Sequence, residues 1–146
     1  MELYLDADGC PVTRLAVKLA AQHRIPCTLL CDTAHSFDFP DVRVITVSKG
    51  AGSADFALVR LVQPGDLVVT QDYGLAAMCL SRGAIPIHQD GMVYTNDNID
   101  GLLFFRAAAR RVRAGGGRLK GQKKRTKAQD EAFAATLRRL MEAQCP

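Results

Sequence analysis

The sequence predicts a three-layer α/β/α protein in which a mostly parallel five-stranded sheet lies between helices. Short apolar runs alternate along the chain with longer segments whose apolar residues recur at helical spacing. The short runs are apolar on both faces, as in strands of a parallel sheet that is covered on both sides. We expect the strand order 3-2-1-4-5, with further helices after the sheet.

The predicted strands are short and rich in aliphatic residues. They comprise residues 3–6, 27–31, 42–47, 66–72 and 85–88. Pro86 places the fifth strand at an edge of the sheet, because proline donates no hydrogen bond to a neighbouring strand. Asp32 stops the second strand, and only the nine residues 33–41 lead from it to the third strand, which is short for a parallel crossover. Either a tight loop joins these two strands or the third strand runs antiparallel.

The predicted helices carry apolar residues three and four positions apart. They comprise about twelve residues from Val12, and then residues 54–62, 74–81, 99–114 and 128–143. The chain is thereby divided into a core of residues 1–114, a basic glycine-rich loop of residues 115–127, and residues 128–146, a C-terminal helix that packs on the core.

Composition sets broad limits on the class of protein. The chain has 146 residues, of which 48% are hydrophobic and 23% charged, as in an ordinary globular domain. No apolar run reaches the roughly 20 residues that cross a bilayer, and no basic segment opens the chain as in a signal peptide. We therefore expect a cytoplasmic protein.

The cysteines favour buried thiols over disulfides. There are five of them and no CxxC pair, which is typical neither of a disulfide framework nor of a zinc ribbon. Cys10 is the exception to follow, because a thiol at the N-terminus of a helix can have a lowered pKa. No histidine is obviously placed to act as its base, which argues against a catalytic role.

Carboxylates follow two of the predicted strands. Asp6 and Asp8 close the first strand, and Asp72 closes the fourth. Because the carboxyl ends of neighbouring parallel strands meet at one edge of the sheet, we expect these acids to converge there. Asp55 lies in the first turn of the helix before strand four, which should reach the same edge. The candidate catalytic residues are Asp6, Asp8, Asp55 and Asp72, with Ser53, a plausible N-cap, and Thr70 in supporting positions.

Several carboxylates at one point repel each other, and a hard divalent cation removes the repulsion. Mg²⁺ takes oxygen ligands and is usually held by one or two carboxylates together with substrate phosphates. We expect Mg²⁺ or Mn²⁺, held by Asp6, Asp8 and Asp72, to assist hydrolysis of a phosphodiester. Asp55 would hold a second metal ion or position the water. In the simpler alternative, Asp8 only caps a helix and Asp55 only favours the helix dipole.

A dense basic segment follows the predicted core. Residues 110–127 contain nine Lys and Arg and no acid, in a chain of net charge +4. Such a segment suits a polyanion, through phosphate contacts and release of counterions. The candidate nucleic-acid-binding residues are Arg111, Arg113, Arg118, Lys120, Lys123, Lys124 and Arg125. We expect RNA rather than DNA as the partner and no membrane; the alternative is a solvated helix end and tail.

Four segments carry a resemblance to a known family: LYLDADGCPV, SADFALV, VVTQDYGLAAMCL and GGGRLKGQKKRT. They resemble the YaiI/YqxD family of uncharacterised bacterial proteins over essentially the whole chain. That family is similar to PIN-like and NYN nuclease domains, in which acids end strand one, lie on a middle helix and follow strand four. Asp6, Asp55 and Asp72 match these positions, and Asp8 is an extra acid. The resemblance implies a compact α/β fold and metal-dependent cleavage of RNA.

Two other functions stay open. LYLDADGCPV is also similar to the hhhDxDG motif of haloacid dehalogenase phosphatases, which would make Asp6 a nucleophile, Asp8 an acid/base and Thr70 the second motif. Such a phosphatase needs a lysine within the core, but the first lysine after Thr70 is Lys120. The other alternative is a non-catalytic RNA-binding protein in which the acids only build the turn.

Overall fold

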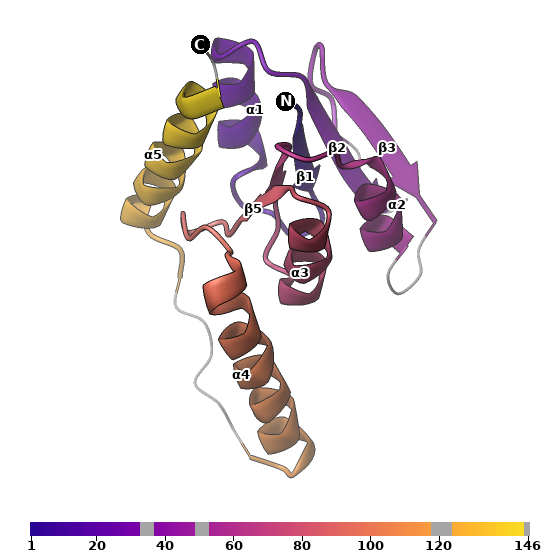
Figure 1. Cartoon of the computed structure of the whole chain (residues 1–146), viewed down its shortest axis with the longest axis vertical. Coiled ribbons are helices and arrows are strands. Elements are labelled where there is room, and N and C mark those ends of the chain that lie inside the picture. Colours follow the sequence, from indigo (N-terminus) through magenta and orange to yellow (C-terminus); the bar gives the residue numbers. More distant parts are fainter. Residues whose placement is uncertain (33–36, 49–52, 118–123, 145–146) are drawn as a thin grey trace.

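The structure, a computed structural model, describes residues 1–32, 37–48, 53–117 and 124–144, without the side chains of residues 53–55 and 144. Five strands form one sheet (Figure 1). They are β1 (Leu3–Asp6), β2 (Cys27–Asp32), β3 (Arg43–Val47), β4 (Leu67–Val69) and β5 (Ile85–Ile87). Their order is β3-β2-β1-β4-β5, and every neighbouring pair is parallel. The predicted strand order and the edge position of Pro86 are therefore confirmed.

The direction of β3, which the sequence left open, is parallel. Thr28 of β2 lies opposite Arg43 of β3, and Asp32 lies opposite Val47. Part of the short connection between these strands falls outside the described residues. After it, Phe37 and Phe39 pack against the hydrophobic core.

Five helices complete the three layers. They are α1 (Thr13–Gln22), α2 (Ser53–Leu61), α3 (Tyr73–Ser81), α4 (Asn96–Ala114) and α5 (Lys127–Gln144). Helices α1 and α5 cover one face of the sheet, and α2 and α3 cover the other (Figure 1). The predicted three-layer α/β/α fold is therefore confirmed.

The helix boundaries differ from the predicted ones by a few residues. Helix α4 begins at Asn96 instead of residue 99, because Thr95 and Asn98 cap it. The Asn98 amide donates to Thr95 Oγ1 at 3.2 Å, and the Thr95 amide donates to Asn98 Oδ1 at 2.9 Å. Each bond satisfies a backbone donor that has no partner inside the helix. Helix α5 begins at Lys127, one residue before the predicted start.

Alternate residues of β1 enter different cores. Leu3 and Leu5 pack in the layer that contains Leu137 of α5, whereas Tyr4 packs with Leu58 of α2. This alternation follows from the two-residue period of a strand. Burial of each such aliphatic side chain contributes about 1.5–3 kcal/mol to stability.

Helix α4 has little of the molecule to pack against. Its N-terminal half contacts α3 through Ile99, which is buried near Ala76 and Tyr94, and the rest of the helix projects away from the sheet (Figure 1). None of the helices in the described residues is both long and apolar enough to cross a membrane.

Candidate active site

Asp6 and Asp8 lie at the carboxyl end of β1. Between them, the Ala7 side chain is buried in the core and the Ala7 amide donates to Leu30 O at 2.9 Å. Anchoring of Ala7 therefore leaves its two neighbours pointing away from that core, as alternate residues of an extended chain do. Asp8 Oδ2 accepts a hydrogen bond from the Asp32 amide at 3.0 Å, which ties Asp8 to the end of β2.

Thr70 connects the ends of β1 and β4. Its side chain is only 2% exposed. The Thr70 hydroxyl donates to Asp6 Oδ2 at 3.0 Å and accepts from the Asp72 amide at 3.0 Å. The Tyr94 hydroxyl in turn donates to Thr70 O at 3.1 Å. A single buried hydroxyl thus links two of the predicted acids, Asp6 and Asp72.

The sequence predicted that Asp72 ends the fourth strand. This is wrong, because β4 stops at Val69. Asp72 instead caps α3: its Oδ1 accepts from the amides of Gly74 at 2.8 Å and Leu75 at 3.2 Å. A β-carbon at Gly74 would lie only 3.3 Å from Asp72 Oδ1, so a larger residue would press on this carboxylate. The carboxylate still reaches the predicted edge of the sheet.

One pocket collects these acids. It has a volume of ≈ 450 Å³ and is lined by Asp6, Asp8, Gln71, Asp72, Tyr73 and Arg106. Asp6 and Asp8 come from the end of β1, and Asp72 comes from the start of α3, just beyond the adjacent strand β4. The predicted position of Asp55 is on α2, but its side chain, like that of Ser53, lies outside the described residues.

Arg106 was missed by the sequence reasoning. It comes from α4, and its Nη1 lies 3.3 Å from Asp72 Oδ1. The side chain is 36% exposed, so the guanidinium is also open to a ligand in the pocket. A signal was present: Arg106 follows Ile99 and Leu103 at helical spacing, on the half of α4 that faces the molecule.

The residues around this pocket suit a hard cation with few protein ligands. In the described part of the chain, no group of three or more His, Cys, Asp and Glu side chains is arranged to hold a metal ion. Mg²⁺ needs no such cage, since it is commonly held by one or two carboxylates together with waters and substrate phosphates. Asp6, Asp8 and Asp72 offer only oxygen atoms, which is the donor type that Mg²⁺ and Mn²⁺ prefer.

Cys10 does not have the lowered pKa that a helix N-terminus could give. Burial raises the pKa of its thiol above the ordinary value. Helix α1 begins three residues later, at Thr13, whose hydroxyl donates to Cys10 O. A protonated, partly buried thiol is a poor nucleophile at neutral pH.

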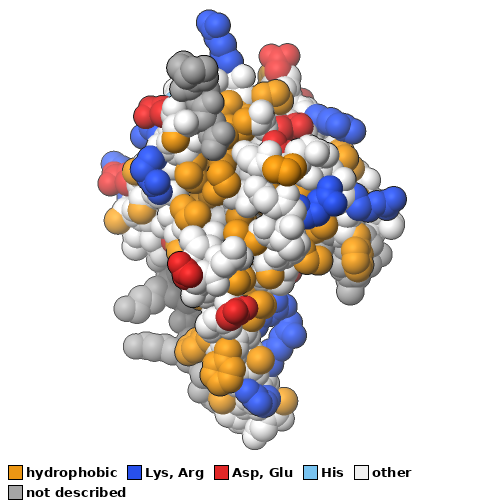
Figure 2. Space-filling view, viewed as in Figure 1, with side chains coloured by type: hydrophobic (Ala, Val, Ile, Leu, Met, Phe, Trp, Pro, Cys, Tyr) orange, Lys and Arg blue, Asp and Glu red, His pale blue; other side chains and the backbone are white. Residues whose placement is uncertain are grey.

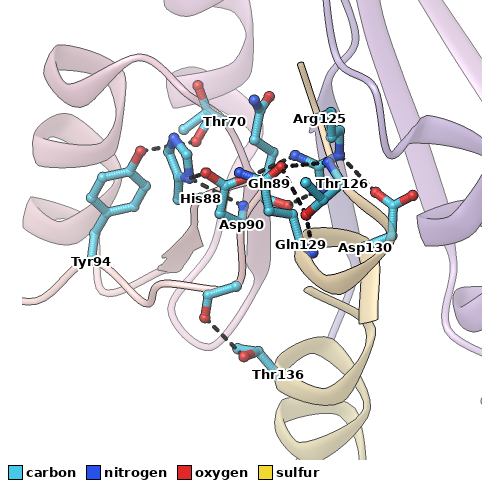
Figure 3. Close-up of polar contacts among 11 residues, drawn as sticks. Thr70, His88, Gln89, Asp90, Tyr94, Arg125, Thr126, Gln129, Asp130 and Thr136 are labelled. Carbon is cyan, nitrogen blue, oxygen red and sulfur yellow. Dashed lines mark hydrogen bonds and ion pairs between the residues drawn. The ribbon is translucent and has the colours of Figure 1, made fainter. Parts of the chain in front are cut away.

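Arg125, predicted to bind nucleic acid, is occupied by the protein itself (Figure 3). Its Nε, Nη1 and Nη2 donate at 2.6 Å each to Asp130 Oδ1, Asp90 Oδ1 and Gln89 O. The side chain is 20% exposed. This guanidinium therefore fastens the start of α5 to the turn after β5, and nothing in the basic run of the sequence distinguished it.

The other predicted basic residues have mixed positions. Arg111, Arg113 and Lys124 are exposed to solvent. Arg118, Lys120 and Lys123 lie outside the described residues.

A second hollow of ≈ 470 Å³ adjoins the acidic pocket and shares Gln71 with it. His88 lines this hollow, and burial lowers the pKa of its ring below the ordinary 6.5. The Asp90 amide donates a hydrogen bond of 3.1 Å to His88 Nδ1. Because Nδ1 is an acceptor, the neutral ring carries its hydrogen on Nε2.

Comparison with known proteins shows to which family the chain belongs. The model of an uncharacterised bacterial family, YaiI/YqxD, matches residues 4–143. This chain belongs to the YaiI/YqxD family. The UPF0178 protein of Exiguobacterium sibiricum is 46% identical over 141 residues, which cover 97% of this chain and 96% of the relative. The UPF0178 protein of Clostridium acetobutylicum is 47% identical over 145 residues, covering 97% of each chain. No solved structure matches significantly.

Proposed function

We propose that this chain is a Mg²⁺- or Mn²⁺-dependent nuclease that hydrolyses phosphodiester bonds in RNA. The observation that carries the proposal is the pocket in which Asp6, Asp8 and Asp72 lie together beside Arg106. Carboxylates gathered in this way favour a divalent cation as counter-charge. A neighbouring guanidinium suits the phosphate oxygens that accompany such a cation.

Each side chain has a role in this proposal. One or two of the carboxylates of Asp6, Asp8 and Asp72 would hold the metal together with waters and substrate phosphate, and the metal would stabilise the negative charge that develops on the phosphodiester. Thr70 keeps Asp6 in place through its 3.0 Å hydrogen bond, and it is a positioning residue. Arg106 would bind a non-bridging phosphate oxygen, with its contact to Asp72 fixing its direction. The role predicted for Asp55, on α2, is to hold a second metal ion or to position the attacking water, and it stays a prediction.

The basic residues supply the second line of support. Arg111, Arg113 and Lys124 are exposed, and they come from the segment that carries nine Lys and Arg without an acid. They would hold the RNA backbone without reading its sequence, because phosphate contacts carry no base information. Arg125 is not included among them, since its donors are used within the protein.

Asp6→Asn tests the proposal. The purified chain with Mn²⁺ is expected to cleave a mixture of single-stranded and structured RNA, and EDTA is expected to abolish cleavage. Asp6→Asn keeps the size of the side chain but removes the charge that a cation needs. We expect it to lower kcat/KM at least about 100-fold, or about 2.7 kcal/mol of transition-state stabilisation.

Asp41→Asn is the matched control. Asp41 is exposed, and its backbone has a positive φ of 62°, a conformation that asparagine also tolerates. Asp41→Asn should cleave RNA like the wild type. The midpoint of thermal unfolding should be the same for the wild type, Asp6→Asn and Asp41→Asn. Absence of cleavage by the wild type with either metal, or full activity of Asp6→Asn, would refute the proposal.

One observation favours a second candidate, a phosphatase with Asp6 as the nucleophile. The Thr70 hydroxyl lies 3.0 Å from Asp6, as a second-motif threonine would lie beside the nucleophile of a haloacid dehalogenase. In the described residues that line the pocket, however, the basic group is Arg106 and not a lysine. Hydrolysis of a small phosphomonoester that beryllofluoride blocks, without cleavage of RNA, would favour this phosphatase.

A further inference from the structure

We propose that the projecting helix α4 pairs with α4 of a second copy of this chain, antiparallel and about a two-fold axis. All residues of this 19-residue helix are described, and Ile99 alone among them is buried. At about 1.5 Å per residue the helix is about 28 Å long, which is enough for a helix–helix interface. The proposal is independent of the proposed function.

The exposed side of α4 carries an apolar stripe. Phe104 is 70% exposed, Phe105 is 74% exposed and Val112 is 43% exposed. Together with Gly101 and Ala108, these residues recur three and four positions apart, which places them on one face of the helix. Figure 2 shows hydrophobic side chains on the surface of this projecting part, with basic side chains beside them.

The stripe points away from the acidic pocket. At about 100° per residue, Ile99, Leu103 and Arg106 lie on the side of α4 opposite the stripe. Those three residues face the body of the molecule, because Ile99 is buried and Arg106 lines the pocket. A partner on the stripe would therefore leave both acidic pockets of a dimer open.

The stripe is complementary to itself in size. We place the two-fold axis of the antiparallel pair level with the midpoint between Arg106 and Ala107 of each helix. Phe105 of each copy then faces Ala108 of the other. Gly101 then faces Val112, and a β-carbon added at Gly101 would meet nothing within 4 Å in the monomer. Large side chains facing small ones allow two helices to interdigitate. In a two-fold dimer, each of these contacts occurs twice.

The charges along α4 are also complementary in this arrangement. Asp97 and Asp100 are exposed near its start, whereas Arg110, Arg111 and Arg113 are exposed near its end. At about 100° per residue, Asp100 and Arg111 lie on the same side of the stripe, so antiparallel pairing places Asp100 of each copy beside Arg111 of the other. RNA is disfavoured as the occupant of the stripe, because the two aspartates beside its first half would repel phosphates.

The oligomeric state of the full chain tests the proposal. Sedimentation equilibrium over a concentration series should show a reversible monomer–dimer equilibrium. Phe105→Ser is expected to raise the dimer dissociation constant about 30-fold, the effect of losing an aromatic residue at an interface centre. Phe56→Ser, which alters a phenylalanine on α2 that is 65% exposed, is the control and should leave that constant unchanged.

Charge reversal tests the antiparallel arrangement. Asp100→Arg and Arg111→Asp should each weaken self-association about tenfold, because each places like charges beside one another. Mixed in equal amounts, these two variants should form a heterodimer about as stable as the wild-type dimer. Circular dichroism checks that both keep their helix content.

Three outcomes would overturn the proposal. The first is a wild-type chain that stays monomeric at all concentrations, and the second is a dimer that Phe105→Ser leaves intact. The third is a mixture of the charge variants that associates no better than either variant alone. A monomeric wild type whose RNA affinity falls with Phe105→Ser would instead make the stripe a surface for base stacking.

Discussion

The Thr70 side chain connects two of the acids of the candidate site. Its hydroxyl is both a donor to Asp6 and an acceptor from the Asp72 amide. Only a hydroxyl side chain offers a donor and an acceptor at the same atom in so little space. The relative positions of two of the predicted metal ligands therefore depend on one buried oxygen.

Thr70→Val should reveal this dependence. Valine keeps the shape of threonine but leaves the part-buried Asp72 amide without its acceptor, which should lower the free energy of unfolding by about 1 kcal/mol. We also expect at least about a tenfold loss of RNA cleavage, since Asp6 is then held less firmly. Urea denaturation and single-turnover cleavage measure the two effects.

Thr70→Ser is the control for this prediction. Serine retains the hydroxyl and loses only a methyl group, so most of the activity should remain. If valine and serine at this position had equal activity, the hydroxyl would have no part in positioning Asp6.

Among the secondary-structure elements, α5 depends most on contacts from a distant segment. Its apolar side enters the core through Phe133, Leu137 and Met141. Its start is held by Arg125, which bridges Asp130 of α5 and Asp90 of the turn after β5. Thr136 adds a hydrogen bond of 2.8 Å to Gly91 O, also in this turn. The C-terminal helix is thus attached beside the hollow that adjoins the acidic pocket.

Arg125→Ala should loosen this attachment. The variant loses three hydrogen bonds from a charged group, but Asp90 and Asp130 are 37% and 47% exposed and become hydrated. We therefore expect a loss of about 2 kcal/mol in the free energy of unfolding, less than three fully buried bonds would contribute. Urea denaturation measures it.

Lys124→Ala, at the neighbouring exposed position, is the matched control and should change stability by less than about 0.5 kcal/mol. A similar small effect of Arg125→Ala would show that the guanidinium contacts do not anchor α5.

At the scale of the whole molecule, charge is unevenly distributed. The net charge is +4, and the long acid-free basic run begins near the end of α4. General attraction of RNA depends on the net charge, whereas the salt dependence of binding reports the phosphates contacted. These two effects can be separated with variants of equal charge.

Arg111→Ala combined with Lys124→Ala should lower the slope of log K for RNA against log salt concentration by about 1.4, or about 0.7 for each lost phosphate contact with a single strand. Arg138→Ala combined with Arg139→Ala removes the same charge from exposed positions on α5 and should leave the slope unchanged. Fluorescence anisotropy with labelled RNA gives both slopes. Equal slopes for the two double variants would mean that Arg111 and Lys124 make no phosphate contacts.

Much of the fold could be predicted because it follows from local patterns. Apolar runs such as Leu3–Leu5 and Val68–Val69 indicated buried strands, and Pro86 indicated an edge. The candidate site followed from the fold, since Asp6 ends β1 and Asp72 lies three residues beyond the end of the adjacent parallel strand β4. The exact end of β4 was predicted less well, because an aspartate that caps a helix and one that closes a strand look alike in sequence.

The sequence by itself determined the alternation of strands and helices, and with it the sheet edge at which the acids gather. These properties depend on the period of apolar residues within a few positions, which the chain displays directly. Tertiary structure alone decided that β3 is parallel, that Arg106 joins the acids and that Arg125 is occupied within the protein. It also decided that Phe104 and Phe105 face solvent. Each of these depends on which distant segment packs alongside, and a local pattern does not contain that information.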